Sequence, residues 1–158
     1  MALLRAGLYP TSQVKTQILL EMLLDGVDTQ TATTITDGPD GWTILEIVCH
    51  LRDFELIWQQ RMRLVIAENN APLPSFSHET LAIENDYKNQ DYPTVWAERI
   101  ALRAESQALI ESISGDTWDR TGMHPEFGPL ALAEIRFQIV LHDIDHLEQI
   151  ARVLGKVG

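Results

Sequence analysis

The sequence predicts an all-α protein folded as a four-helix bundle. Long segments carry apolar residues at helical intervals, capping residues or Gly and Pro stand at their ends, and no segment shows convincing strand alternation. At 158 residues, 45% of them hydrophobic, the chain is long and apolar enough to bury one core. We therefore expect a single bundle domain over residues 1–158.

The helix boundaries follow from capping residues and helix breakers. Thr43 is a suitable N-cap and Glu46, three residues later, completes a capping box, so the second helix has the clearest start. Residues 28–41, 75–92 and 118–129 are expected to be connections, the middle one irregular apart from a short helical turn. The four predicted helices are Thr11–Asp25, Thr43–Asn69, Thr94–Ile113 and Leu130–Leu154.

Charge and hydropathy exclude several classes of protein. The net charge is −11, with 23 acidic and 12 basic residues and no cluster of Lys and Arg, so we expect no nucleic-acid binding. No apolar run reaches the roughly 20 residues of a membrane span, and residues 1–10 lack the pattern of a signal peptide. The single cysteine, Cys49, fits a reducing cytoplasm and is expected to be a buried packing residue.

Two histidines near the C-terminus have the spacing of metal ligands. His142 and His146 stand four residues apart, so both lie on one face of the predicted fourth helix, and His50 on the second helix offers a third imidazole. Three imidazoles leave at least one position on a cation open, which is typical of catalytic sites. We expect Zn²⁺, with Ni²⁺, Mn²⁺ or Fe²⁺ as alternatives. His78 and His124 fall in connections and are expected not to be ligands.

The spacing alone does not settle metal binding, since two histidines at this interval also occur by chance in helices that bind nothing. Among their polar neighbours, Asp53 is the candidate for proton transfer and Gln149 for a hydrogen bond to substrate or bound water. Asp143 and Asp145 are interpreted as outer or surface groups, Asp145 being placed to orient a histidine. We interpret Glu55, Trp58 and Arg61 as a buried aromatic residue accompanied by a surface ion pair.

The predicted fourth helix carries a second apolar stripe, nearly opposite the histidines. It consists of Phe137, Val140, Ile144, Leu147 and Ala151. One helix of a monomeric bundle rarely needs two apolar faces, so we expect a second copy of the chain to cover this stripe in a homodimer. The alternative is that the long connections cover it.

Several short motifs in this chain resemble the DinB/YfiT-like superfamily, and the likeness covers nearly the whole length. The motifs are Gly41-Trp42-Thr43, the run from Glu46 to Leu51, the set Glu55, Trp58 and Arg61, the loop from His124 to Leu130, and His142-Asp143-x-x-His146-x-x-Gln149-Ile150. The resemblance implies an up-down-down-up four-helix bundle, often dimeric. It also implies a divalent metal held at one end by His50, His142 and His146.

The resemblance further implies an activity. Characterised relatives are mostly thiol-dependent enzymes, namely S-transferases that use bacillithiol or a similar thiol, and a mycothiol-dependent isomerase. The implied function is a metal-dependent thiol S-transferase acting on small electrophiles, with a low-molecular-weight thiol as cofactor. Two alternatives stay open: a metal-dependent hydrolase in which water replaces the thiol, and a non-catalytic metal-binding dimer of the stress response.

Overall fold

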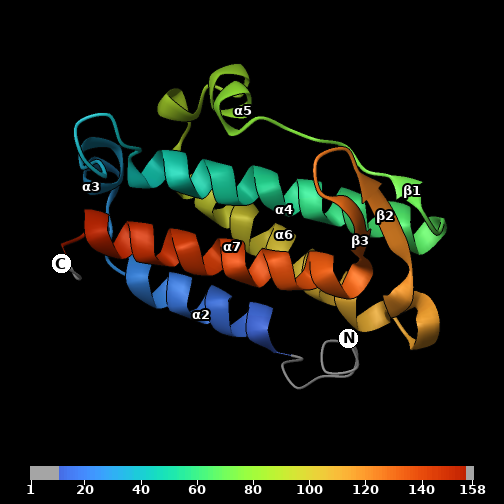
Figure 1. Cartoon of the computed structure of the whole chain (residues 1–158). Helices are drawn as coiled ribbons and strands as arrows, with labels where there is room; N and C mark the ends of the chain where they lie inside the picture. The colour runs from blue at the N-terminus through green and yellow to red at the C-terminus, as the bar shows by residue number, and fades with distance from the viewer. Residues whose placement is uncertain (1–10, 156–158) are drawn as a thin grey trace.

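The computed structural model describes residues 11–155, and its long helices form the predicted four-helix bundle (Figure 1). The bundle helices are α2 (Ser12–Leu24), α4 (Ile44–Ala67), α6 (Tyr92–Ser112) and α7 (Leu132–Val153). In Figure 1, α2 and α7 run in one direction and α4 and α6 in the other, which is the expected up-down-down-up order. Residues 1–10, for which a signal peptide was not expected, lie outside the described residues. None of the helices within 11–155 combines the length and the hydropathy that a membrane crossing needs.

The start of α4 is fixed by the predicted capping box. The side chain of Thr43 accepts a hydrogen bond from the backbone N–H of Glu46, and a carboxylate oxygen of Glu46 accepts one from the backbone N–H of Thr43 at 2.9 Å. Gly41 stands just before this cap, where a Cβ would lie 2.0 Å from the backbone oxygen of Asp37. Only glycine fits that close approach of two backbone segments. The sequence therefore sets where α4 begins, and so where His50 stands along the bundle.

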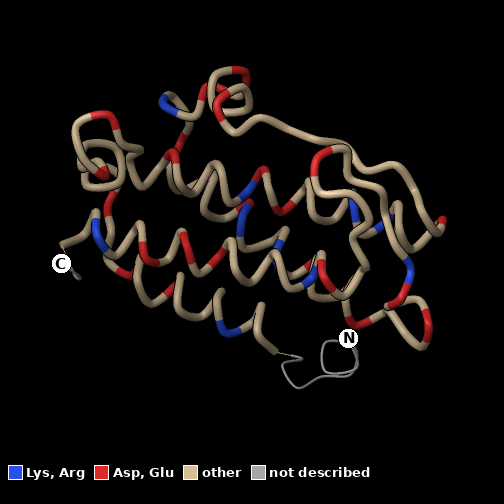
Figure 2. The backbone as a smooth tube through the Cα atoms, viewed as in Figure 1, with Lys and Arg blue, Asp and Glu red and all other residues tan. Residues whose placement is uncertain are grey.

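The core is divided into two apolar clusters along the bundle. On α4, one cluster includes residues up to Leu51 and the other begins at Phe54; on α7, the second cluster ends at Ile139 and the first resumes at Ile150. The segments between these limits carry polar side chains into the bundle. These segments form a polar middle layer between the two apolar clusters, and further buried polar side chains, among them Arg61, His124 and Arg136, lie outside it. Figure 2 shows that acidic and basic residues are spread along the whole length of the bundle.

Short elements fill the connections, and two sequence predictions are wrong there. Residues 28–41 contain a helix, α3 (Thr29–Thr34), capped by the Asp28 side chain at 2.8 Å from the Thr31 backbone nitrogen. A small sheet is also present, in the order β1-β2-β3, with β1 parallel and β3 antiparallel to β2. Its strands are too short to show alternation, which is why the sequence pattern missed them. They are β1 (Ala71–Pro72), β2 (Thr121–His124) and β3 (Gly128–Ala131).

Three further short helices lie in the connections. Two of them lie between α4 and α6, and the third lies between α6 and β2. They are α5 (His78–Glu84), η1 (Tyr87–Asn89) and η2 (Gly115–Asp119). The α5 helix has no buried residue and packs against α4. It matches the expected short helical turn of residues 75–92, and Figure 1 shows it above the N-terminal half of α4.

The second apolar stripe of α7 is partly exposed. Val140 is buried, whereas Phe137 and Ile144 are 46% and 48% exposed. Ile18 and Met22 of the adjacent α2 are also exposed, at 48% and 67%. The described connections therefore do not cover this stripe fully. Association into a homodimer stays a prediction, which light scattering at micromolar concentration would test.

Candidate metal centre

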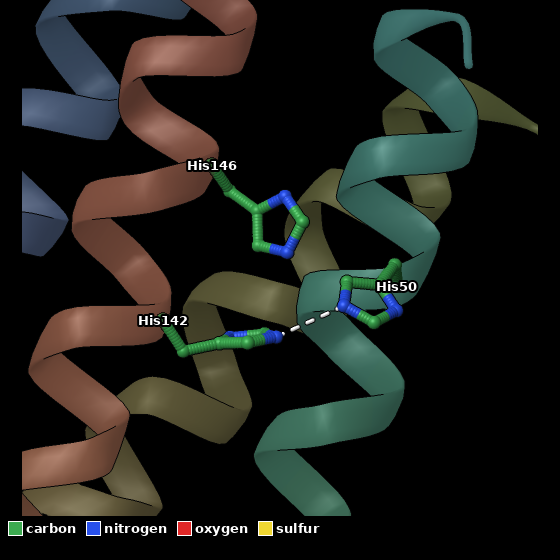
Figure 3. Close-up of side chains that lie close together, drawn as sticks. All are labelled: His50, His142 and His146. Atoms are coloured by element: carbon green, nitrogen blue, oxygen red, sulfur yellow. Dashed lines mark hydrogen bonds between the residues drawn. The ribbon is translucent and has the colours of Figure 1, made fainter. Parts of the chain in front are cut away.

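Three histidine side chains from two helices meet in the middle layer of the bundle (Figure 3). His50 of α4 faces His142 and His146 of α7, and one ligand nitrogen from each lies within 4.8 Å of the other two. The Nε2 atoms of His50 and His142 are 2.9 Å apart. The structure thus brings together the three residues that the sequence singled out, across 92 residues of chain between His50 and His142.

This arrangement follows from two simple local facts. His142 and His146 are one turn apart on α7, so their imidazoles lie on one face of the helix, edge to face, with ring centroids 4.6 Å apart. The α4 and α7 helices lie against each other, and the capping box marks the start of α4, seven residues before His50.

The electrostatics keep all three imidazoles neutral. Burial lowers the pKa of His50 to about 2, with further lowering by His142 and His146. Burial and then His146 lower the pKa of His142 to about 3, and burial also lowers the pKa of His146. At neutral pH each ring therefore carries one proton and one free lone pair, which is the form that binds a metal.

The donor set fits a divalent cation. Two nitrogens at roughly 2.0–2.1 Å from one ion lie about 2.9–3.4 Å apart at common coordination angles, and the observed Nε2 separation of 2.9 Å falls at the lower end of this range. Among the described residues, the group of close ligand atoms includes neither a carboxylate nor a thiolate. Three protein nitrogens leave room on the ion for further ligands.

Gln149 orients one of the three rings. Its side-chain oxygen accepts a hydrogen bond from Nδ1 of His146 at 2.8 Å. With its proton held on Nδ1, His146 presents the lone pair of Nε2 to the site. The sequence placed Gln149 on the face of the histidines, and the structure shows it bonded to His146. Its predicted hydrogen bond to substrate or bound water stays a prediction.

Aromatic rings surround His50. The ring of Trp42 lies 5.2 Å from it edge-on, Phe54 lies at 4.4 Å, and the fourth histidine, His78, lies at 5.0 Å between ring centroids. Phe54 also stacks on His142, with centroids 5.0 Å apart. His78 and His124 are not part of the group of ligand nitrogens.

Both carboxylate oxygens of Asp53, the candidate for proton transfer, accept hydrogen bonds from residues other than the three histidines. One of its oxygens accepts from Arg52 Nε at 2.8 Å, and the other accepts from Asn85 Nδ2 and the Tyr87 hydroxyl, both at 2.7 Å. Asp53 thus ties the segment after α5 to α4. This arrangement favours an anchoring role over the predicted proton transfer. Cys49 is buried, and burial raises the pKa of its thiol to about 12, so it is a packing residue and not a nucleophile.

Next to the histidines, the structure contains a buried network of ion pairs that the sequence did not predict. Arg103 of α6 lies 2.8 Å from oxygens of both Glu55 and Asp143, and Arg99 lies within 3.5 Å of the same two carboxylates. The sequence interpretation of Asp143 as an outer or surface group and of Glu55 as part of a surface ion pair was therefore wrong about their surroundings. Asp143 adjoins His142 along α7, but its side chain accepts a hydrogen bond from Thr16 of α2 and pairs with α6.

Arg61, the third member of the predicted set Glu55, Trp58 and Arg61, is also buried. Arg61 donates to the backbone oxygen of Pro74 at 2.8 Å and lies over the ring of Trp58, 5.0 Å from its centre. A second nitrogen contact, at 3.1 Å, joins Arg61 to His124. Trp58 is buried, as expected, but Arg61 holds the connection before α5 rather than a surface carboxylate.

Comparisons with known proteins agree with the fold, and the names of two relatives mention a metal. A relative from Bacillus subtilis, YfiT, is 24% identical over 132 residues, which span 81% of this chain and 73% of YfiT, and it is named as a candidate metal-dependent hydrolase. A relative from Oceanobacillus iheyensis with the same kind of name is 25% identical over 134 residues, spanning 85% of this chain and 76% of the relative.

Solved structures show the same architecture. The structure of YfiT, described as a four-helix bundle of unusual topology, superposes with a TM-score of 0.75 at 19% identity, over 92% of this chain and 85% of YfiT. A mycothiol-dependent maleylpyruvate isomerase superposes with a TM-score of 0.76 at 13% identity, over 89% of this chain and 58% of the isomerase. The sequence pattern of the DinB superfamily matches residues 14–150. The chain belongs to the DinB superfamily.

Proposed function

We propose that this protein is a divalent-metal-dependent hydrolase of small electrophilic molecules. The observation that carries the proposal is the meeting of three neutral imidazoles from two helices, with no carboxylate or thiolate among their close ligand atoms within residues 11–155. The names of the relatives, which describe metal-dependent hydrolysis, support the same choice. Zn²⁺ is the proposed ion, with Ni²⁺, Mn²⁺ and Fe²⁺ as alternatives.

The residues of the proposed site have different roles. His50, His142 and His146 would hold the ion, which when bound lowers the pKa of a coordinated water or thiol toward neutrality. Gln149 keeps the proton of His146 on Nδ1, so that Nε2 stays a ligand. Phe54 stacks on His142 and gives the site an apolar wall, which strengthens electrostatic interactions inside it.

Thiol transfer is the second candidate. It differs from hydrolysis only in the attacking group, a low-molecular-weight thiolate in place of hydroxide. The same fold in a mycothiol-dependent isomerase supports keeping it. A non-catalytic metal-binding dimer of the stress response is the third possibility, and it predicts binding without turnover.

One experiment separates the three. Protein purified without a nickel column is stripped with a chelator and reloaded with Zn²⁺, Ni²⁺, Mn²⁺ or Fe²⁺. Chromogenic esters and a chromogenic electrophile are then offered with and without a panel of thiols. Metal-dependent ester cleavage without thiol supports the hydrolase, and thiol-dependent turnover supports the transferase.

Two variants make the assay specific to the site. Turnover should vanish in His146→Ala and persist in Glu148→Gln, which alters an exposed side chain two residues away. Metal binding by the wild type with no turnover of any substrate would contradict both enzyme proposals. Failure of the wild type to bind any of the four ions would contradict the metal centre itself.

A further inference from the structure

One nitrogen of the histidine cluster has no hydrogen-bond partner. It is Nδ1 of His50, a residue that is only 1% exposed. In Figure 3 this atom points away from His142 and His146, while Nε2 points toward His142. Because Nε2 is the atom directed at the other imidazoles, a metal-bound neutral ring must carry its proton on Nδ1. That N–H is a donor in need of an acceptor.

Several groups around His50 cannot accept a hydrogen bond from its Nδ1–H. Both oxygens of Asp53, one turn further along α4, already accept from Arg52, Asn85 and Tyr87. The ring of Trp42 has only a donor nitrogen, and Phe54 has no polar atom. Gln149 is occupied by His146.

His78 is a neighbouring side chain with an acceptor nitrogen, and its ring plane is tilted by 30° from that of His50. Its ring centre lies 5.0 Å from that of His50, as near as the rings of His142 at 4.9 Å and His146 at 4.7 Å. Two imidazoles joined edge to edge by an N–H···N hydrogen bond of roughly 2.9 Å have centres about 5 Å apart. His78 is exposed as a residue, and its ring is stacked on Phe54, with ring centroids 4.8 Å apart and planes at 14°.

The segment that carries His78 is held against α4 at both ends. Arg61 binds the backbone oxygen of Pro74 before α5, and Asp53 binds Asn85 after it. The α5 helix has no buried residue of its own. These two attachments and the stack on Phe54 keep His78 beside His50.

We propose that His78 is the outer partner of His50, accepting the hydrogen bond from Nδ1 when Nε2 binds the metal. His78 is then a positioning residue, which fixes the tautomer and the ring orientation of a ligand without touching the ion. It performs for His50 the task that Gln149 performs for His146. The inference rests on the proposed metal centre.

The test uses two replacements of His78 that separate the hydrogen bond from the stack. His78→Phe keeps an aromatic ring against Phe54 but removes the acceptor, and His78→Gln keeps an acceptor but removes the ring. Affinity for Zn²⁺ is measured by competition with a chromophoric chelator on the full chain. We expect His78→Phe to bind about 10- to 100-fold more weakly than the wild type and His78→Gln to recover most of that loss.

A spectroscopic measurement accompanies the affinity. In the Zn²⁺-loaded wild type, the ¹⁵N-labelled imidazole of His50 should show a protected Nδ1–H proton, and this signal should exchange with solvent in His78→Phe. Thermal melts of the metal-free variants show whether each one folds.

Every outcome bears on the proposal. Wild-type affinity and an unchanged Nδ1–H signal in His78→Phe would overturn it and leave water as the partner of His50. Weak binding by His78→Gln together with normal binding by His78→Phe would also overturn it, because the stack alone would then matter. Failure of the wild type to bind Zn²⁺ overturns the metal centre and this inference together, so the two failures are distinguishable.

Discussion

Two polar regions lie in the middle layer of this bundle, and they are built on opposite rules. The ion-pair network of Glu55, Asp143, Arg99 and Arg103 combines two negative and two positive charges, all buried and in contact with each other. The histidine cluster, which adjoins the network through His142 and Asp143, carries no charge at neutral pH and directs free nitrogens at each other.

This difference in charge indicates which region maintains the fold and which is available for chemistry. The network compensates its charges internally and joins α4, α6 and α7, with Thr16 and Gln17 adding α2. Its charges balance, although Glu55 Oε1 and Arg99 Nε are buried without a hydrogen-bond partner. The histidine cluster spans only α4 and α7, and we propose that a divalent cation completes it. Four predictions test this contrast.

The largest effect is expected on breaking the network. Arg103→Met removes the cation that contacts both carboxylates and leaves buried negative charge poorly compensated, which should lower the free energy of unfolding by about 3–5 kcal/mol. Urea unfolding measures the change. The matched control is Arg152→Met, which also removes two ion pairs but from the surface, and should cost less than about 1 kcal/mol. Equal costs for the two variants would show that the network does not stabilise the fold.

Metal removal should have the next largest effect, and of a different kind. Stripping the protein with a chelator should leave the helical circular dichroism signal unchanged, because the bundle does not depend on the cluster. Adding Zn²⁺ at 100 to 1,000 times its Kd should then raise the free energy of unfolding by roughly 3–4 kcal/mol. In His146→Ala the same addition should have almost no effect. Unfolding on chelation would contradict the division of roles.

Removing the partner of a ligand should have a smaller effect. Gln149→Leu deprives Nδ1 of His146 of its acceptor and should weaken Zn²⁺ binding by about 10- to 100-fold, while the metal-free protein keeps its stability. Competition with a chelator measures the affinity. The neighbouring exposed Glu148→Gln serves as the control, and an affinity in Gln149→Leu equal to that of this control would assign the ring orientation to packing alone.

The smallest effect is expected at the start of α4. Thr43→Ala removes the capping box seven residues before His50 and should cost about 1 kcal/mol of stability, with no change in Zn²⁺ affinity. Thr33→Ala, which alters an exposed helical threonine, should cost less. A Zn²⁺ affinity that falls along with stability would show that the cap also positions His50.

The comparison of the two regions also shows what could be predicted from the sequence. The histidine cluster was found because its signal is local: a four-residue interval on one helix and one more histidine on an apolar face. The start of α4 followed from Thr43 and Glu46 for the same reason. These patterns depend on residues that are neighbours in the chain.

The network was missed because its signal is not local. The buried positions of α6 include Arg99, Arg103 and Ser106, whereas Leu102 and Leu109 are only half-buried. Arginine is rarely buried without a partner, and its partners here stand on α4 and α7, more than 35 residues away in either direction. Hydropathy alone therefore gives no sign that these arginines are buried.

The order in which the ligands occur along the chain has a consequence for biosynthesis. His50 emerges from the ribosome before His142 and His146, which lie on α7, so the complete set of imidazoles exists only after α7 has been made. Chains that terminate before α7 cannot assemble the centre, whatever else of the bundle they form. Tight zinc retention would then mark molecules in which α7 is present and docked, and would distinguish them from products truncated before α7.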